Sequence, residues 1–351
     1  MPPTASVPSL ATAQARRVDL DDDAQCAAVY AAVLASRTHE RPWDDSDGYE
    51  QTVAEWRYDD PAERTEKWAV EENGDVIGVT TLWMSQHDNT DKIWAELDVH
   101  PERRRRGAGT ALVEALERRA REVGRHEILV ELYLPDGDSD APSYERFAAA
   151  HDYLRESTDK VRILDLPVPD EVLGPLEASA RERWADAYRL ETYTDGLREE
   201  LVAGYCRVSN LLNVDAPTGA VDFEAETLTP ERYQRYLDLE RRQGRRRLTT
   251  VAIEKATGEV VAYTDLVLPS GAPSKVWQWG TLVDREHRGH RLGMAVKVAN
   301  LRELQRAHPE RETVGTGNDA TNSYMVGINV ELGFRVVELA RMYRKVLTDE
   351  A

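Results

Sequence analysis

Cysteine and long apolar runs are scarce in this sequence, and each scarcity excludes a class of protein. The 351 residues include only two cysteines, Cys26 and Cys206, which are far apart and have no histidine at metal-ligand spacing. A disulfide framework and a zinc site are therefore not expected. No apolar run approaches the roughly 20 residues that a membrane helix needs, and residues 1–17 show no secretory signal pattern. The sequence predicts a cytoplasmic protein that does not enter membranes.

Basic residues are also in deficit. The chain has 45 Lys and Arg against 64 Asp and Glu, which gives a formal net charge of −19. Proteins that bind nucleic acid nonspecifically need broad positive surface, so this class is not expected. An acidic surface is typical of a solubility device, and it would also steer a cationic amine substrate toward the protein.

A long internal repeat is present instead. The segment ENGDVIGVTTLWM from Glu72 resembles KATGEVVAYTDLVL from Lys255, and an offset of 184 residues places Gly74 on Gly258 and Gly109 on Gly293. A period this long indicates a duplicated domain, which suits a chain too long for one ordinary core. We expect a first domain at 1–168, a linker rich in Pro and Gly at 169–189, and a second domain at 190–351.

Each half shows the same order of predicted elements. A helix precedes a hairpin, whose turn lies at Asn73-Gly74 in the first half and at Gly258 in the second; a strand, a glycine loop and an amphipathic helix follow. A further strand, a helix and a closing strand end each half, at 159–167 and 336–346. The fold class is therefore α+β, as two tandem domains that each have a mixed, mostly antiparallel sheet flanked by helices.

Four arginines stand before Gly-Ala-Gly in the segment HPERRRRGAG, which begins at His100 and leads into a helix. The first amides of a helix have no intrahelical partner, and the helix dipole adds partial positive charge there. Glycines permit close approach, and arginines hold outer phosphate groups. An ordinary glycine turn with exposed arginines is the alternative. Recurrence of the loop at the same offset favours phosphate binding.

This order of elements resembles the GNAT superfamily of N-acetyltransferases, whose signature Arg/Gln-x-x-Gly-x-Gly/Ala opens a helix. Residues 104–109 match it fully, whereas 288–293 have Arg291 in place of the middle glycine. The segment NDATNSYMVGINVELGF resembles the last helix of the family. The resemblance covers nearly the whole chain, in the tandem arrangement exemplified by mycothiol synthase.

The resemblance implies that acetyl-CoA binds as co-substrate, without a metal, in an opening between the fourth and fifth strands of a domain. The residues that it implies for cofactor binding are Leu97, Asp98, Val99, Arg104, Arg105, Arg106, Gly107, Ala108, Gly109 and Thr110 in the first half, and Thr281, Leu282, Val283, Arg288, Gly289, His290, Arg291, Leu292, Gly293 and Met294 in the second. Asn318 and Asn322 are either contacts of the CoA arm or helix caps.

Acetyl transfer needs a base for the amine and an acid for the leaving thiolate. Members of the superfamily often place a carboxylate base where this chain has Glu96, which strand alternation puts on the same face as Asp98; the alternative for Glu96 is a solvated carboxylate. Gly280 stands at the corresponding position of the second half.

The tyrosine that serves as acid in many members is replaced by Asn329, and by Ala148 in the first half. Tyr324 is the remaining candidate acid, or an ordinary aromatic at the edge of the core. The second half is richer in polar groups near its last helix and is expected to be the working domain. Trp277 and Trp279 either line an acceptor pocket or, as we expect, pack against the core or the sister domain.

The sequence thus predicts acetyl transfer from acetyl-CoA to a primary amine of a small molecule or peptide, by direct attack in a ternary complex. A noncatalytic acyl-CoA-binding or sensor protein is the alternative. The acceptor is left open, as is the choice between a monomer and a homodimer.

Overall fold

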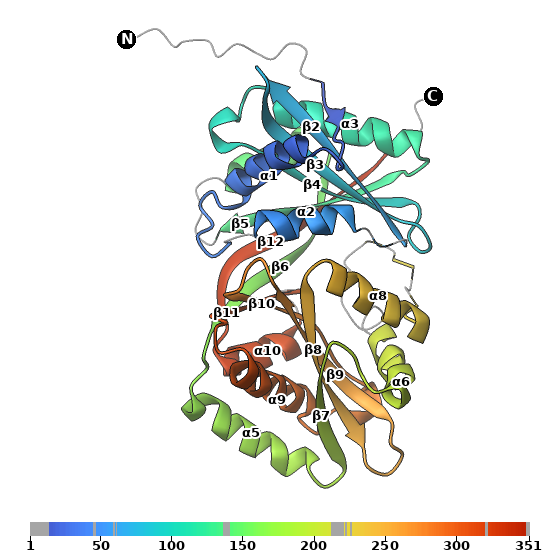
Figure 1. The fold of residues 1–351 in the computed structure, drawn as a ribbon, viewed down its shortest axis with the longest axis vertical. Coiled ribbons are helices and arrows are strands. Elements are labelled where there is room, and N and C mark those ends of the chain that lie inside the picture. Colours follow the sequence, from blue (N-terminus) through green and yellow to red (C-terminus); the bar gives the residue numbers. More distant parts are fainter. Residues whose placement is uncertain are drawn as a thin grey trace. The chain divides into compact units, whose positions relative to one another are not determined.

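The computed structural model in Figure 1 describes residues 14–44, 47–58, 60, 62–135, 141–211, 221, 223–224, 227–319 and 322–348. Most of the N-terminal stretch that was tested for a signal pattern therefore lies outside the described residues. The chain divides into two compact units, the first made of Met1–Ser157 with Arg341–Ala351 and the second of Thr158–Ala340. No helix in the described part is long and apolar enough to cross a membrane.

The first unit has helices on a mixed sheet. Its strands follow the order β1-β2-β3-β4-β5-β12, in which β4 and β5 are parallel and the β2–β3 and β3–β4 pairs are antiparallel. Its elements are β1 (Arg16–Arg17), α1 (Asp23–Arg37), α2 (Tyr49–Arg57), β2 (Glu63–Glu72), β3 (Asp75–Ser85), β4 (Lys92–Val99), the short 3-10 turn η1 (Pro101–Arg103), α3 (Ala108–Glu122), β5 (Glu127–Pro135), α4 (Ala141–Ala150) and the later part of β12 (Arg335–Val346).

The second unit repeats this plan. Its strands follow the order β6-β11-β10-β9-β8-β7, with β10 and β11 parallel and the β8–β9 and β9–β10 pairs antiparallel. Its elements are most of β6 (Leu154–Asp165), α5 (Asp170–Trp184), β7 (Tyr188–Thr194), α6 (Glu199–Asn210), α8 (Pro230–Arg242), β8 (Arg245–Glu254), β9 (Val260–Pro269), β10 (Lys275–Val283), the 3-10 turn η2 (Arg285–His287), α9 (Leu292–Ala307), β11 (Thr313–Asp319), α10 (Ser323–Leu332) and the first part of β12. The predicted α+β class with a mixed sheet is confirmed.

Both predicted hairpins are present. The turn between β2 and β3 has Asn73 and Gly74 in the left-handed region, at φ 55° and 90°, as a tight hairpin with this sequence requires. Gly258 is left-handed in the turn between β8 and β9. The hairpins fix which residues of β3 and β9 face each side of the sheet, and so they set the geometry of the strands next to the glycine loops.

The segment expected as a linker, 169–189, is mostly the helix α5 of the second unit. Leu173 and Ala180 are fully buried in the same core cluster as Leu301 of α9. Arg302 of α9 pairs with carboxylates of α5. Proline and glycine suggested an irregular segment, but Pro169 is the residue just before the helix, and α5 continues through Pro175 in its interior.

The closing strands are not confined to the halves in which they were expected. Residues 341–346 of β12 belong to the first unit, where Tyr343 and the following Leu347 lie in the core cluster with Leu116. Lys345 there pairs with a glutamate of α3. Residues 158–165 of β6 belong to the second unit and pair with β11. The two compact units therefore do not begin and end at the expected domain limits, residues 168 and 190. An apolar pattern predicts a strand but not the strand with which it pairs.

Candidate functional site

The two glycine loops have the same backbone conformation although their sequences differ. The residue just before α3 is Gly107 and the residue just before α9 is Arg291, and both are left-handed, at φ 95° and 55°. Two residues earlier, Arg105 and Gly289 are also left-handed, at φ 63° and 87°. Each loop therefore has two left-handed positions and only one of the two is glycine. The departure of Arg291 from the signature keeps the loop shape at the expense of backbone strain.

Both loops leave the start of a helix open to an anion. Neither Gly107 nor Arg291 offers a side-chain cap to the first amides of its helix, and successive backbone N–H groups in such turns form anion-binding concavities. Arg104 Nε donates to the carbonyl oxygen of Val99 at 3.4 Å, and Arg288 Nε to that of Val283 at 3.3 Å. The same arginine brace therefore ties each loop to the end of its strand.

The last glycine of each loop serves helix packing. A methyl group at Gly109 would lie 3.0 Å from the ring of Phe147 on α4, and one at Gly293 would lie 3.1 Å from Ile328 on α10. Both distances are too short for an ordinary carbon contact. These glycines are thus required for the close approach of α3 to α4 and of α9 to α10, which is a different reason from the room for phosphate that the sequence suggested.

A strand opening lies beside each loop. Parallel pairing of β4 with β5 ends at Ala95, although β4 continues to Val99. Pairing of β10 with β11 ends at Trp277, although β10 continues to Val283. The predicted cofactor-binding segments at 97–99 and 281–283 therefore lie beyond the last parallel pair, next to the loops. Backbone groups on that edge are available to a ligand.

The proposed base of the first half is held in an ion pair. The Glu96 carboxylate binds the guanidinium of Arg37, at the end of α1, and the same guanidinium lies 3.7 Å from Asp98. Glu96 and Asp98 share a face, as expected. Burial raises the pKa of Asp98, despite the lowering effect of Arg37. The role of Arg37 was not predictable from the sequence, because no spacing rule links the end of α1 to β4.

The other predicted polar residues are separated by the structure. Tyr324, in the first turn of α10, is 77% exposed, and its hydroxyl has no hydrogen-bond partner in the described part of the chain. Asn322 caps α10 by accepting from the amide of Met325 at 3.2 Å, as the capping alternative requires. Asn318 lies on β11 and accepts a hydrogen bond from Asn329, which is fully buried. Asn318 is therefore the member of this set that joins a polar network.

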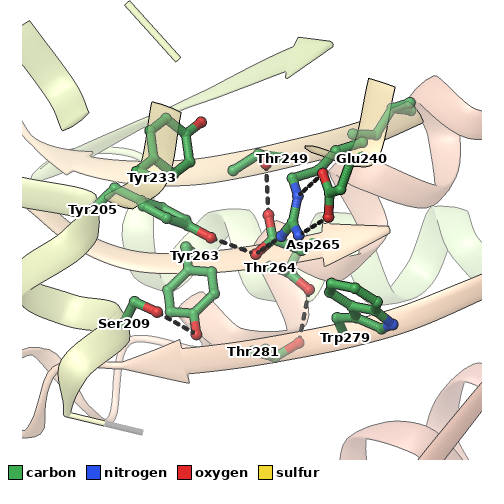
Figure 2. Close-up of polar contacts among 12 residues, drawn as sticks. Tyr205, Ser209, Tyr233, Glu240, Thr249, Tyr263, Thr264, Asp265, Trp279 and Thr281 are labelled. Atoms are coloured by element: carbon green, nitrogen blue, oxygen red, sulfur yellow. Dashed lines mark hydrogen bonds and ion pairs between the residues drawn. The ribbon is translucent and has the colours of Figure 1, made fainter. Parts of the chain in front are cut away.

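A second polar network lies in the second unit on the face toward α6 and α8, and sequence reasoning missed it (Figure 2). Asp265 on β9 is 2% exposed and accepts hydrogen bonds from Tyr205 at 2.7 Å and Thr249 at 2.5 Å. Arg247 lies 3.1 Å from Asp265 and also binds Glu240. Burial raises the pKa of Asp265. These groups come from separate elements, so no local motif announces them.

The same face carries two partly exposed tryptophans on or beside this network. The Arg247 guanidinium stacks on the Trp279 ring, 4.9 Å from its centroid. Trp279 is 44% exposed and Trp277 is 38% exposed. Both rings are therefore partly accessible, as an acceptor pocket would require.

Gly280 has a steric reason in the second unit. A methyl group there would lie 2.5 Å from the hydroxyl oxygen of Tyr263. The side-chain space that Glu96 uses in the first unit is therefore taken by a phenol hydroxyl in the second. Burial raises the pKa of Tyr263, so this hydroxyl is a poor base at neutral pH.

Comparison with known proteins gives a consistent result. Residues 30–148 match the Acetyltransferase (GNAT) family. The mycothiol acetyltransferase of Saccharomonospora viridis is 26% identical over 262 residues, which is 71% of this chain and 73% of that protein.

Solved structures share the fold along almost the whole chain. A tandem GNAT protein from the clavulanic acid biosynthesis pathway, solved without acetyl-CoA, superimposes with a TM-score of 0.75 at 24% identity, covering 97% of this chain and 100% of that one. A GCN5-related N-acetyltransferase from Sphaerobacter thermophilus gives 0.67 at 17% identity, with 96% of each chain covered. The repeated loops, the strand openings and these likenesses together show two tandem copies of the GNAT fold, the first of which contains the segment that matches the Acetyltransferase (GNAT) family.

Proposed function

We propose that this protein transfers the acetyl group of acetyl-CoA to a primary amine of a small molecule or peptide, by direct attack within a ternary complex. The observation that carries the proposal is the uncapped helix start behind two left-handed residues, repeated beside a strand opening in both units. The family uses acetyl-CoA as co-substrate, and its pyrophosphate suits the amides of these loops. The pantetheine arm would pair with the free strand edges.

The transfer itself requires few groups. The neutral amine nitrogen attacks the thioester carbon, a C–N bond forms, and the C–S bond then breaks with its electron pair left on sulfur as the thiolate. The amine proton passes to a base or through water to solvent, and the thiolate is protonated last. Backbone amides at the strand edge stabilise the oxyanion that exists after the C–N bond has formed and before the C–S bond breaks.

The second unit is the proposed site of this chemistry. In the first unit the carboxylate of Glu96 is engaged by Arg37. In the second unit Trp277 and Trp279 offer exposed aromatic surface on the face toward α6 and α8, beside the strand opening. An amine that approaches on this face reaches the opening from the side opposite α9. Exposed aromatic rings bind organic amines well, through apolar contact and attraction of an ammonium group.

Matched variants of the two loops test the proposal. Arg104→Glu and Arg288→Glu place a negative charge at equivalent points of the two loops. Calorimetric titration with acetyl-CoA is expected to find two sites in the wild type and one in each variant, because an arginine contact to phosphate contributes about 2 kcal/mol and reversal of its charge costs more.

Release of CoA thiol across a panel of amines then identifies the working unit. Arg288→Glu is expected to lose turnover at acetyl-CoA concentrations that saturate the wild type, whereas Arg104→Glu keeps it. The opposite pattern would place the chemistry in the first unit. Binding without thiol release for every amine would instead favour an acyl-CoA-binding or sensor protein, and absence of binding to both loops would refute the proposal.

A further inference from the structure

The helix α9 carries a lysine in the core of the second unit. Lys297 is 1% exposed, and its Nζ donates to the amide oxygen of Asn329 at 2.8 Å and lies 5.5 Å from the centroid of the Phe334 ring. No carboxylate within the described residues pairs with it. Lysine is almost never fully buried without an anionic partner, and burial lowers the pKa of Lys297 to about 7. Packing alone does not account for an amine at this position.

Lys297 begins a hydrogen-bond chain with a fixed direction. An amine nitrogen donates to Asn329, so the atom of Asn329 that receives it is the amide oxygen, and the amide nitrogen of Asn329 must point away. That nitrogen donates to the amide oxygen of Asn318 at 2.6 Å. The amide nitrogen of Asn318 is left as a donor, and it has no acceptor among the described residues. The chain therefore runs from a buried amine to an unused N–H group.

This unused donor lies at the strand opening. Pairing of β10 with β11 ends at Gly315, and Asn318 follows three residues later on β11. Its side chain points to the α9 and α10 side, since it meets Asn329 of α10. The loop at the start of α9 flanks the same opening. A thioester bound with its pyrophosphate on that loop would run along β11 past Asn318.

The polar chain is absent from the first copy. By the repeat offset Val113 of α3 corresponds to Lys297, and by the count from the last helix Ala148 of α4 corresponds to Asn329. Both residues belong to an apolar core cluster of the first unit. The two positions have thus diverged together, which is expected of residues that act together and is not required by the fold.

We propose that Lys297 and Asn329 polarise the amide of Asn318 so that it donates a hydrogen bond to the thiolate of coenzyme A as the C–S bond breaks. Asn318 is then the catalytic residue, and Lys297 and Asn329 are positioning residues. Hydrogen bonds in a chain strengthen one another, and a charge at one end makes the far donor stronger. The thiolate keeps the bonding pair and later takes its proton from water, so the chain needs to lose no proton. This inference rests on the proposed acetyl-CoA site of the second unit.

Product coenzyme A is a suitable probe, because it carries the thiol and needs no acceptor. The ultraviolet absorbance of the thiolate reports the thiol pKa of bound coenzyme A in the wild type, in Lys297→Met and in Asn329→Ala. We expect each variant to raise this pKa by about one, a tenfold weaker stabilisation of the thiolate, while the affinity for the thiol form is unchanged. Val113→Met, at the equivalent position of the first unit, is the matched control and is expected to leave the pKa as it is.

A double variant shows whether Lys297 and Asn329 act through one hydrogen-bond chain or affect the thiol pKa independently. Lys297→Met with Asn329→Ala is expected to raise the thiol pKa no further than either change alone, because both break the same chain. Where an active amine is known, kcat should fall about tenfold in the same variants with little change in KM.

The outcomes separate the two proposals. Coenzyme A that binds with the same thiol pKa in all variants would refute the chain, and so would effects that add in the double variant. Failure of coenzyme A to bind the wild type would instead refute the acetyl-CoA site on which the chain rests.

Discussion

Replacement of Lys297 by methionine is expected to stabilise the second unit at neutral pH, although it deletes a hydrogen bond. Burial lowers the pKa of Lys297 from 10.5 to about 7 in the folded protein. A difference of about 3.5 between the folded and unfolded values corresponds to about 5 kcal/mol of lost stability while the folded lysine is charged. Methionine fills a similar volume without a charge. The amide oxygen of Asn329 loses its donor at a cost of about 1–3 kcal/mol, so the net gain is about 2–4 kcal/mol.

The gain must depend on pH in a defined direction. Because the folded pKa lies below the unfolded one, the unfolded chain binds more protons between about pH 7 and pH 10.5, and the stability of the wild type rises over this window. The methionine variant lacks this rise. Its advantage is therefore largest below about pH 7, shrinks as the pH rises, and reverses near pH 10.5, where only the lost hydrogen bond remains.

Urea unfolding at the two ends of this window measures the effect. The difference in midpoint between Lys297→Met and the wild type should change sign with pH, whereas Val113→Met in the first unit should give a pH-independent difference. A methionine variant that is less stable at neutral pH, or whose difference from the wild type does not vary with pH, would show that Lys297 is not a buried, uncompensated amine.

Three further predictions concern the loops, the last strand and the first unit. Arg291→Gly removes the strain of a left-handed arginine backbone and should raise the stability of the second unit by about 1 kcal/mol in thermal unfolding. Gly107→Ala should lower the stability of the first unit by a similar amount. No change in either variant would contradict the shared loop geometry. Removal of residues 341–351 should abolish hydrogen-exchange protection in the first unit, because burial of the Tyr343 and Leu347 side chains there contributes about 2–3 kcal/mol each to its stability. Protection that stays intact would refute the assignment of this strand to the first unit. Arg37→Gln leaves Glu96 and Asp98 as unpaired neighbours and should destabilise the first unit by about 1–2 kcal/mol near pH 7, since Arg37 is partly solvent-screened. This loss should shrink as the pH falls, because burial raises the folded pKa of Asp98 and the folded state takes up the proton first; a loss that does not vary with pH would contradict this.

The parts of the fold that depend on local sequence were predictable. The turn at Asn73-Gly74 needs residues that tolerate the left-handed region, and a hairpin followed from it. The loops were found by their recurrence, and the α+β class followed from the repeated order of elements. What failed were partner choices. The sequence of β12 predicts a strand. Whether its end joins the first or the second half depends on which hydrophobic core Tyr343 and Leu347 complete, and that is a property of the whole fold.

The functional residues divide in the same way. The two glycine loops have a motif, so their positions could be predicted from the sequence. Lys297, Asn329 and Asn318 lie on three elements and meet only in space, as do Arg247 and Asp265. Lys297 interrupts the apolar first turns of α9, and this irregularity is a local signal in the sequence. A single lysine in an amphipathic pattern is usually exposed, so the sequence alone does not predict its burial.

The two copies differ in a way that bears on their roles. Their loops share one backbone conformation although a different left-handed position is glycine in each, so the loop shape does not depend on which of the two positions is glycine. Their interiors have diverged. The first copy has Val113 at the position of Lys297, and its Glu96 is held by Arg37. The second retains a buried amine that costs folded stability at neutral pH.

A costly group persists where function offsets the loss, since most single changes at a strained or charged core position would raise stability. The position of Lys297 behind the opening of the second unit therefore favours the proposal that the chemistry takes place in that unit. The sign of the stability change in Lys297→Met tests this without knowledge of the acceptor. If the methionine protein is the more stable at neutral pH and the weaker at stabilising the thiolate, the cost and the use of the same amine will have been measured separately.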